Sequence, residues 1–326
     1  MKKTILIGFM IIALLFLAGC NDEGRRDTGP ARTPFVGGRN ALSMEFVEGA
    51  PPIEIFDNAQ FPFSINIKIE NLGEHDIETT DGYLEITGIN PVDFGLSGQA
   101  DLKQDIPHNI RGVVKNFQGT ILVGDTIIAE FSELNYQENI RGNWDGPRIR
   151  ANLCYNYETE ATTYVCLKRD MLANLDSTEI CSLNEQKQVY NSGAPIHITK
   201  VTQTPLGSDK IQVQFEISHV GSANDRFYKV DTECDDSATN TDRDKVFFEI
   251  PTDINGNYAQ CSGLEESTGN SGYVKLFSGR PRSVICTFEV GNIEGAFEKQ
   301  LTATLRYRYH QFIEKRILVK DVSTGN

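Results

Sequence analysis

Apolar residues alternate with polar ones along most of this chain, and that period of two constrains the fold more than any other feature. Ile65, Ile67 and Ile69 are separated by polar residues, and the same pattern runs through residues 211–217. Successive side chains of a strand point to opposite faces of a sheet, so the pattern predicts antiparallel strands with one buried face. Further strands are predicted at residues 43–47, 83–86, 121–123, 126–131, 245–250, 273–277 and 283–290. With one helix at 170–188 as the only exception, the predicted fold class is all-β.

An internal repeat divides this region into two halves. Residues 149–168 match residues 301–320 at a constant offset of 152 without a gap, and the pairs include Tyr155 with Tyr307. Upstream, residues 52–55 resemble 195–198, and 69–73 resemble 217–221. The same elements in the same order predict two copies of one fold, at residues 41–180 and 190–321. We interpret each Tyr-x-Tyr segment as part of a closing hairpin, which turns near Glu160 in the first copy, with Tyr155 and Tyr307 in the cores of independent sandwiches.

The strand pattern within each half is typical of an Ig-like β-sandwich. Asn71-Leu72-Gly73 and His219-Val220-Gly221 each follow a predicted strand directly. These elements resemble the start of CARDB-type and other Ig-like domains of prokaryotic envelope proteins. The resemblance implies two tandem Ig-like β-sandwich domains that serve as stalks, spacers or adhesive modules.

The amino terminus predicts export. Lys2 and Lys3 precede an apolar run from Ile5 to Ala18, which is shorter than the roughly 20 residues that a bilayer span needs. The run ends in Leu17-Ala18-Gly19-Cys20, which resembles the lipobox of prokaryotic lipoproteins. The resemblance implies that residues 1–20 are a lipoprotein signal peptide and that Cys20 carries a diacylglycerol. An ordinary cleaved signal and an uncleaved anchor are the alternatives.

Residues 21–40 are rich in glycine and proline, which predicts a flexible linker between that lipid and the first sandwich. The predicted location is therefore the extracytoplasmic face of the cell membrane, with the N-terminal lipid as the contact to the bilayer.

Six further cysteines favour disulfides over a metal site, because the chain is predicted to be exported and none of them has a zinc-type spacing. They are Cys154, Cys166, Cys181, Cys234, Cys261 and Cys286. In a hairpin turning near Glu160, Cys154 lies opposite Cys166, so we predict a bridge between them. Each half holds three of the six, so complete pairing requires one bridge between the halves, for which Cys181 is the candidate.

The charge balance argues against nucleic-acid partners. Arginine and lysine number 31 against 45 aspartates and glutamates, giving a formal net charge of −14 without a basic patch. No nucleotide-binding, nucleophile-elbow or metalloprotease motif occurs, and His75, His108, His197, His219 and His310 have no paired spacing. We therefore expect no catalytic residues, no metal and no cofactor.

Two local features stay open at this point. The segment 231–244 gathers six acidic residues, which suit either a solvated loop or calcium, although no EF-hand pattern is present. Trp144 lies in a turn-like context and suits either a core-capping ring or an exposed anchor for a glycan or protein. Asn255-Gly256, by contrast, is a hairpin-turn signal.

The predicted function is that of a non-enzymatic, lipid-anchored surface protein that acts in adhesion, scaffolding or ligand binding, with a protein or glycan partner. The alternative is an envelope enzyme that acts on glycans, or its carbohydrate-binding accessory, in which the fold brings paired carboxylates together.

Overall fold

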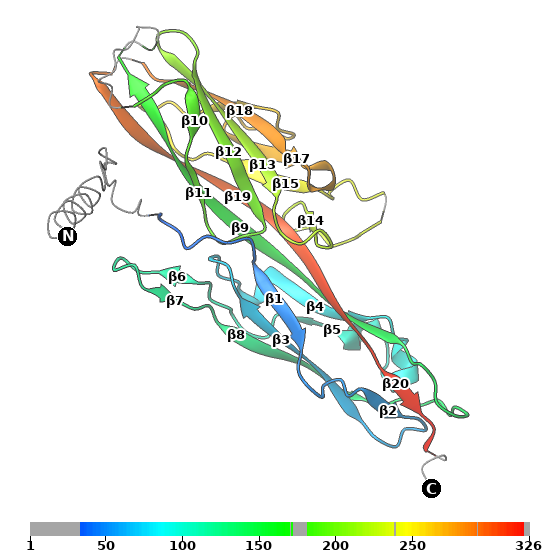
Figure 1. Ribbon diagram of the computed structural model, residues 1–326. Coiled ribbons are helices and arrows are strands. Elements are labelled where there is room, and N and C mark those ends of the chain that lie inside the picture. Colours follow the sequence, from blue (N-terminus) through cyan, green and yellow to red (C-terminus); the bar gives the residue numbers. More distant parts are fainter. Residues whose placement is uncertain (1–32, 170, 172–180, 238, 292, 323–326) are drawn as a thin grey trace, which may run out of the picture. The chain divides into compact units, whose positions relative to one another are not determined.

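The computed structural model describes residues 33–169, 171, 181–237, 239–291 and 293–322 (Figure 1). Within them the chain is mostly strand, and its helices are short 3-10 segments. The all-β class is confirmed, and every segment predicted as a strand overlaps an observed one. No helix among the described residues is long and apolar enough to cross a bilayer. The predicted signal peptide and Cys20 lie outside the described residues.

The strands are β1 Leu42–Phe46, β2 Glu54–Phe56, β3 Phe63–Asn71, β4 Gly82–Thr87, β5 Lys103–Asp105, β6 Val114–Lys115, β7 Ile121–Leu122, β8 Thr126–Leu134, β9 Arg148–Lys168, β10 Glu185–Lys187, β11 Val189–Asn191, β12 Ile196–Pro205, β13 Lys210–His219, β14 Arg226–Tyr228, β15 Lys245–Glu249, β16 Gln260–Ser262, β17 Ser271–Lys275, β18 Arg282–Glu289, β19 Ala296–Arg316 and β20 Leu318–Lys320. The 3-10 segments are η1 Thr79–Asp81, η2 Pro91–Phe94, η3 Gln99–Leu102 and η4 Phe277–Gly279.

One large sheet runs through both halves of the sequence. Its strand order is β17-β15-β19-β9-β4-β5, with β11 attached to β9 and β14 attached to β19. The first half adds the sheet β1-β3-β8, and the second half adds β10-β12-β13-β18-β16. All of these strands belong to one compact unit, Pro34–Asn326, which also holds the three disulfides. The two halves are therefore joined in a common sheet, and the boundaries predicted at 180 and 190 stay predictions.

The centre of the large sheet is the antiparallel pair β9 and β19, which run side by side in Figure 1. They pair along 21 positions, from Arg148 opposite Arg316 to Lys168 opposite Ala296. Every odd-numbered residue of β9 from Ile149 to Leu167 is buried. The odd-numbered residues of β19 are their cross-strand neighbours, and those from Leu301 to Tyr309 are buried too, so the middle of this face belongs to the core.

The hairpin predicted to turn near Glu160 is wrong, because β9 continues through that residue as a single strand. The stretch 157–163 holds three threonines and no glycine, proline, asparagine or aspartate, and β-branched residues favour extended backbone. The repeat is nevertheless real at the level of structure. Its two long strands pair with each other rather than each folding back on itself.

Four tyrosines lie at the middle of this pair, around a local two-fold axis. Asn156 faces Arg308, its own counterpart at the offset of 152, so the axis passes between them. On either side, Tyr155 faces Tyr309 and Tyr157 faces Tyr307, with ring centroids 6.0 and 6.3 Å apart. At most 1% of any of these four side chains is exposed.

The hydroxyls of Tyr155 and Tyr307 stand at equivalent positions of the repeat. They hydrogen-bond β1 and β12, which belong to the two smaller sheets. Tyr155 accepts the backbone N–H of Leu42 at 3.3 Å and donates to Gln311, whose amide donates to the Leu42 carbonyl at 3.0 Å. In the other half Tyr307 bonds the backbone of Ile196 and the hydroxyl of Thr159 at 3.0 Å, and Thr159 donates to the Ile196 carbonyl. Both first strands, β1 and β12, are held to the large sheet in the same way.

These contacts correct the upstream part of the repeat. Leu72 and Gly73 donate backbone N–H groups to the Ala41 carbonyl, and Val220 and Gly221 donate to that of Pro195. The match of 69–73 with 217–221 is confirmed. The match of 52–55 with 195–198 is wrong, because Glu54–Phe56 forms β2 and pairs in parallel with β20.

The predicted Cys154–Cys166 bridge is also wrong. Twelve residues of continuous strand separate the two cysteines by about 40 Å, far beyond the reach of a disulfide. Cys154 instead bonds Cys234, and Cys166 bonds Cys181. Cys261 bonds Cys286 across β16 and β18. One bridge joins the two halves, as the odd count in each half requires, but it comes from Cys154 and not from Cys181.

The predicted helix at 170–188 is wrong where the structure describes it, because Glu185–Lys187 forms strand β10. Residues 170 and 172–180 lie outside the described ones. The turn predicted at Asn255-Gly256 is confirmed. Both residues have positive φ, 52° and 82°, as a type I′ hairpin turn requires, and Ile254 pairs with Asn257 across it.

Truncating a core tyrosine should destabilise both halves together. We expect Tyr155→Ala and Tyr307→Ala each to lower the free energy of unfolding by about 3–5 kcal/mol, because each removes a buried ring. Since β9 and β19 form one ladder, calorimetry of the unit 34–326 should show a single lowered transition.

Tyr164→Ala is the matched control, because this side chain is 41% exposed on the opposite face of β9 and should change stability by no more than about 0.5 kcal/mol. Neutral core variants, or a second transition that keeps its midpoint, would contradict the shared-ladder account.

Candidate functional site

The acidic segment 231–244 does not converge on a point. Asp231 accepts from Asn156, Glu233 accepts from Tyr83 at 2.9 Å, and Asp236 accepts from Tyr228 at 2.8 Å. Each carboxylate is thus engaged by a different neighbour. Among the residues that the structure describes, no three His, Cys, Asp or Glu side chains are grouped as a metal would need.

Trp144 lies at the surface rather than in the core. Its side chain is 45% exposed, and its ring centroid lies 6.3 Å from that of Tyr136. The backbone of Trp144 pairs with Val319, which fixes the ring beside β20. Trp144 is therefore half-exposed, with Tyr136 as its aromatic neighbour.

A half-buried hydrogen-bond network surrounds the Tyr309 hydroxyl, beside a cavity of about 360 Å³. The Tyr309 hydroxyl donates to Asp225 at 2.8 Å and lies 2.9 Å from Nε2 of His219. Burial raises the pKa of Asp225 and lowers that of His219. Gly221 is required here, because a Cβ at that position would lie 2.7 Å from the tyrosine oxygen. These groups hold the end of β13 against β19, so we assign them a structural role.

A second cavity, of about 260 Å³, has Glu74, Glu158 and Glu160 among its lining residues. Glu74 is fully engaged by backbone N–H groups of Val36, Gly37 and Gly193, at 2.7–2.9 Å. Burial raises the pKa of the Glu158 carboxyl, and the nearby Arg306 offsets only part of this rise. Glu158 and Glu160 are the pair of carboxylates that the glycan-enzyme alternative calls for.

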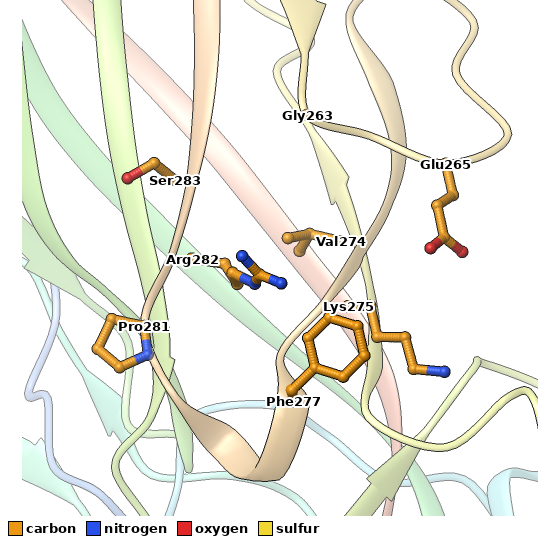
Figure 2. Close-up of a pocket in the computed structure, with 8 residues that line it drawn as sticks. All are labelled: Gly263, Glu265, Val274, Lys275, Phe277, Pro281, Arg282 and Ser283. Carbon is orange, nitrogen blue, oxygen red and sulfur yellow. The ribbon is translucent and has the colours of Figure 1, made fainter.

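A third cavity, of about 520 Å³, combines an exposed aromatic ring with two cations (Figure 2). Phe277, at the start of η4, is 52% exposed. The Arg282 guanidinium lies 4.9 Å from the ring centroid, and the Lys275 ammonium lies 5.6 Å from it. Figure 2 shows the Arg282 guanidinium turned toward the ring. We take this cation–aromatic cavity, between β17 and β18, as the candidate functional site.

Local backbone structure presents the ring at the cavity mouth. The turn between β17 and β18 spans only residues 276–281, and Ser278 takes a left-handed conformation with φ of 55°. Leu276 is fully buried and anchors the turn, which leaves Phe277 directed outward. The Cys261–Cys286 disulfide clamps β16 to β18, and Gly263 directly after β16 lines the opposite wall.

The charges at this site are available to a ligand. Glu265 also lines the cavity, but its carboxylate pairs with Lys245 at 3.2 Å. Within the described part of the chain, no carboxylate forms a salt bridge with Lys275 or Arg282. On a chain with a net charge of −14, two cations beside one open ring form a local site that attracts an anionic group.

Sequence reasoning missed this site. Lys275, Phe277 and Arg282 stand within eight residues, but the alternation placed Phe277 at the end of a predicted strand. The only available signal was the Ser-Gly-Arg-Pro segment after it, which marks a turn.

Comparisons with known proteins assign no function. No family model matches the chain, and no curated protein matches it. Among solved structures, the secreted serine protease VesC from Vibrio cholerae shows a TM-score of 0.17 and 8% identity, over 84% of this chain and 51% of that one. The collagen binding domain of Erysipelothrix rhusiopathiae surface protein RspB shows a TM-score of 0.13 and 10% identity, over 86% and 90%. The chain spans about half the length of the VesC chain, and neither likeness is close enough to carry an argument.

Buried histidines should make stability depend on pH near neutrality. Burial lowers the pKa of His75, His197, His219 and His310 below the ordinary value of 6.5. The unfolded chain therefore takes up protons at a pH where the folded chain does not, and stability is lost as the pH falls through about 6.5. We expect the urea midpoint of unfolding to decrease between about pH 7.5 and pH 5.5.

The raised pKa values of Asp225 and Glu158 act in the opposite direction, because the folded chain takes up protons at these two carboxylates at a higher pH than the unfolded chain does. A midpoint that stays constant or rises between about pH 7.5 and 5.5 would show that the buried imidazoles do not control the response.

Proposed function

We propose that this chain is a lipid-anchored extracytoplasmic binding module that holds an acidic saccharide in the cation–aromatic cavity. The observation that carries the proposal is the exposed Phe277 ring flanked by Lys275 and Arg282, neither in a salt bridge with a carboxylate of the described residues. The lipobox-like segment ending at Cys20 supports the location, and the disulfides suit an oxidising compartment.

A sugar suits this geometry better than a flat or purely apolar ligand. A pyranose can place its C–H face on the exposed ring, while its carboxylate or sulfate meets the planar fork of Arg282. Lys275 adds a second, more adaptable donor beside the same ring. Ser283 also lines the cavity, but its hydroxyl accepts from the Gln214 amide at 2.8 Å and is directed away from the ring (Figure 2).

Binding should depend on the cations and the ring together. With polygalacturonic acid as the probe and dextran as the neutral control, we expect affinity for the acidic polymer only, decreasing as salt is added. Arg282→Gln should weaken binding by about 2 kcal/mol, which is roughly thirtyfold, because it removes a charge-assisted bond. Phe277→Ala should weaken it to a similar extent. Isothermal titration measures both.

Lys200→Gln is the matched control, because Lys200 is exposed on β12 and does not line the cavity. Equal binding of dextran, or an Arg282 variant as active as the control, would overturn the proposed ligand class.

The same polymer tests the enzymatic alternative, which Glu158 and Glu160 favour by lining one cavity. New reducing ends that appear with the wild type and vanish with Glu158→Gln would make the chain a glycan-cleaving enzyme and overturn the non-enzymatic proposal.

Anchoring is tested separately in the full chain. We expect the wild type to fractionate with membranes and Cys20→Ser to be released or left unprocessed, because the lipid supplies the affinity for the bilayer. Cys20 lies among residues 1–32, outside the described part, so a lipid at this residue is checked directly by mass spectrometry of the N-terminal peptide. An N-terminal peptide of the wild type that is neither cleaved nor lipidated would favour an uncleaved apolar anchor instead.

A further inference from the structure

The hairpin β6–β7, residues 113–124, is an addition to the repeated fold. In the second half, residues 276–281 alone connect β17 to β18. The equivalent connection in the first half, between β5 and β8, takes residues 106–125 and carries the hairpin as a separate two-stranded sheet. Since the second half forms its sandwich without such an insertion, the fold does not account for it.

The hairpin exposes apolar side chains that a water-facing turn does not need. Phe117 at its tip is 92% exposed and Val123 is 84% exposed. Val114, Ile121 and Leu122 are each about half exposed. Contiguous exposed apolar surface of this kind marks a place where something apolar docks.

Much of the backbone at the hairpin tip is hydrogen-bonded internally. Val114 pairs with Leu122, and the Asn116 carbonyl accepts the N–H of Gly119 at 2.9 Å. The Asn116 side chain accepts the N–H groups of Gln118 and Thr120 at 3.0 and 2.9 Å. These bonds reduce the number of peptide groups that must lose water when the tip enters the interfacial part of a bilayer.

The position of the hairpin indicates which apolar phase it meets. Pro34 and Phe35, where the compact unit begins, line one cavity together with Val113, Val114 and Lys115 at the base of the hairpin. The chain that leads to Cys20 thus leaves the unit beside this hairpin. Only residues 21–33 separate Cys20 from Pro34, and these thirteen residues can span at most about 45 Å.

The charge of the segment agrees with this direction. On a strongly acidic chain, residues 113–124 contain one lysine and no aspartate or glutamate. A lipid surface would therefore meet no carboxylate on the hairpin itself, and an anionic one would not be repelled by it.

We propose that the β6–β7 hairpin inserts its apolar tip into the outer part of the bilayer and is a second membrane contact of the module. The orientation that it gives the module rests on the proposed lipid anchor at Cys20. The insertion itself does not, because every residue involved belongs to the unit 34–326.

The unlipidated unit 34–326 tests the hairpin separately from the anchor. It contains every described strand and all three disulfides. We expect it to float with vesicles of phosphatidylcholine containing a minority of phosphatidylglycerol, and to remain bound in high salt. Phe117→Ser should weaken this binding about tenfold to a hundredfold, the range expected for removing one buried aromatic ring. Because the ring is 92% exposed, this variant should keep the wild-type melting midpoint.

Tyr258→Ser is the matched control, because it removes a 58% exposed aromatic side chain next to the Asn255-Gly256 turn and should bind vesicles like the wild type. Failure of the wild-type unit to bind, equal binding by Phe117→Ser, or equal loss in Tyr258→Ser would each overturn the proposal. So would a dimer, seen by analytical ultracentrifugation, that disappears in Phe117→Ser while vesicle binding is unaffected. If Cys20 carries no lipid but the unit 34–326 still binds vesicles, the proposed anchor is wrong and the proposed hairpin contact stands.

Discussion

The antiparallel ladder between β9 and β19 is the interaction on which the rest of this structure depends. It brings the two copies of the repeat together, so that each tyrosine of one copy faces a tyrosine of the other. The hydroxyls of Tyr155 and Tyr307 then hydrogen-bond β1 and β12. These strands belong to the sheets β1-β3-β8 and β10-β12-β13-β18-β16, respectively. Because unpaired buried hydroxyls and peptide groups are costly, this arrangement fixes the spacing between the layers at equivalent points.

Disulfides and close packing reinforce the same core. The Cys154–Cys234 bridge closes a loop of 80 residues and links the two halves beside the central pair. In the chain-entropy account, a loop of this size contributes about 4–5 kcal/mol. Gly73 is needed near Tyr157, because a Cβ there would lie 2.5 Å from the Gly193 carbonyl and would clash with the tyrosine oxygen. Gly221 plays the equivalent role near Tyr309.

The two proposed sites occupy the same position of the repeat. The connection after β17 forms the wall of the cation–aromatic cavity, and the equivalent connection after β5 forms the apolar hairpin. A duplicated scaffold leaves much of such connections free to change, because only a few of their residues, such as Leu276 and Ile110, belong to the core. In the proposed arrangement, one copy contacts the membrane and the other holds the ligand.

The sequence by itself determined the all-β class, the strands with a clear alternation and the presence of a repeat. Alternation at Ile65, Ile67 and Ile69 is a local property, because it reflects which side of a single strand meets the core. The Asn255-Gly256 turn was predictable for the same reason, since positive φ at two adjacent positions is a preference of the residues themselves.

Only the tertiary structure decided which strands pair and which cysteines meet. Residues 148–168 could turn back or continue, and the partner β19 lies more than 120 residues away in sequence. That choice moved Cys154 away from Cys166 and toward Cys234. The candidate site could not be predicted for the same reason. Lys275, Phe277 and Arg282 line one cavity only because the turn between β17 and β18 brings their side chains together. Long-range pairing and side-chain direction depend on the whole chain, and no local pattern encodes them.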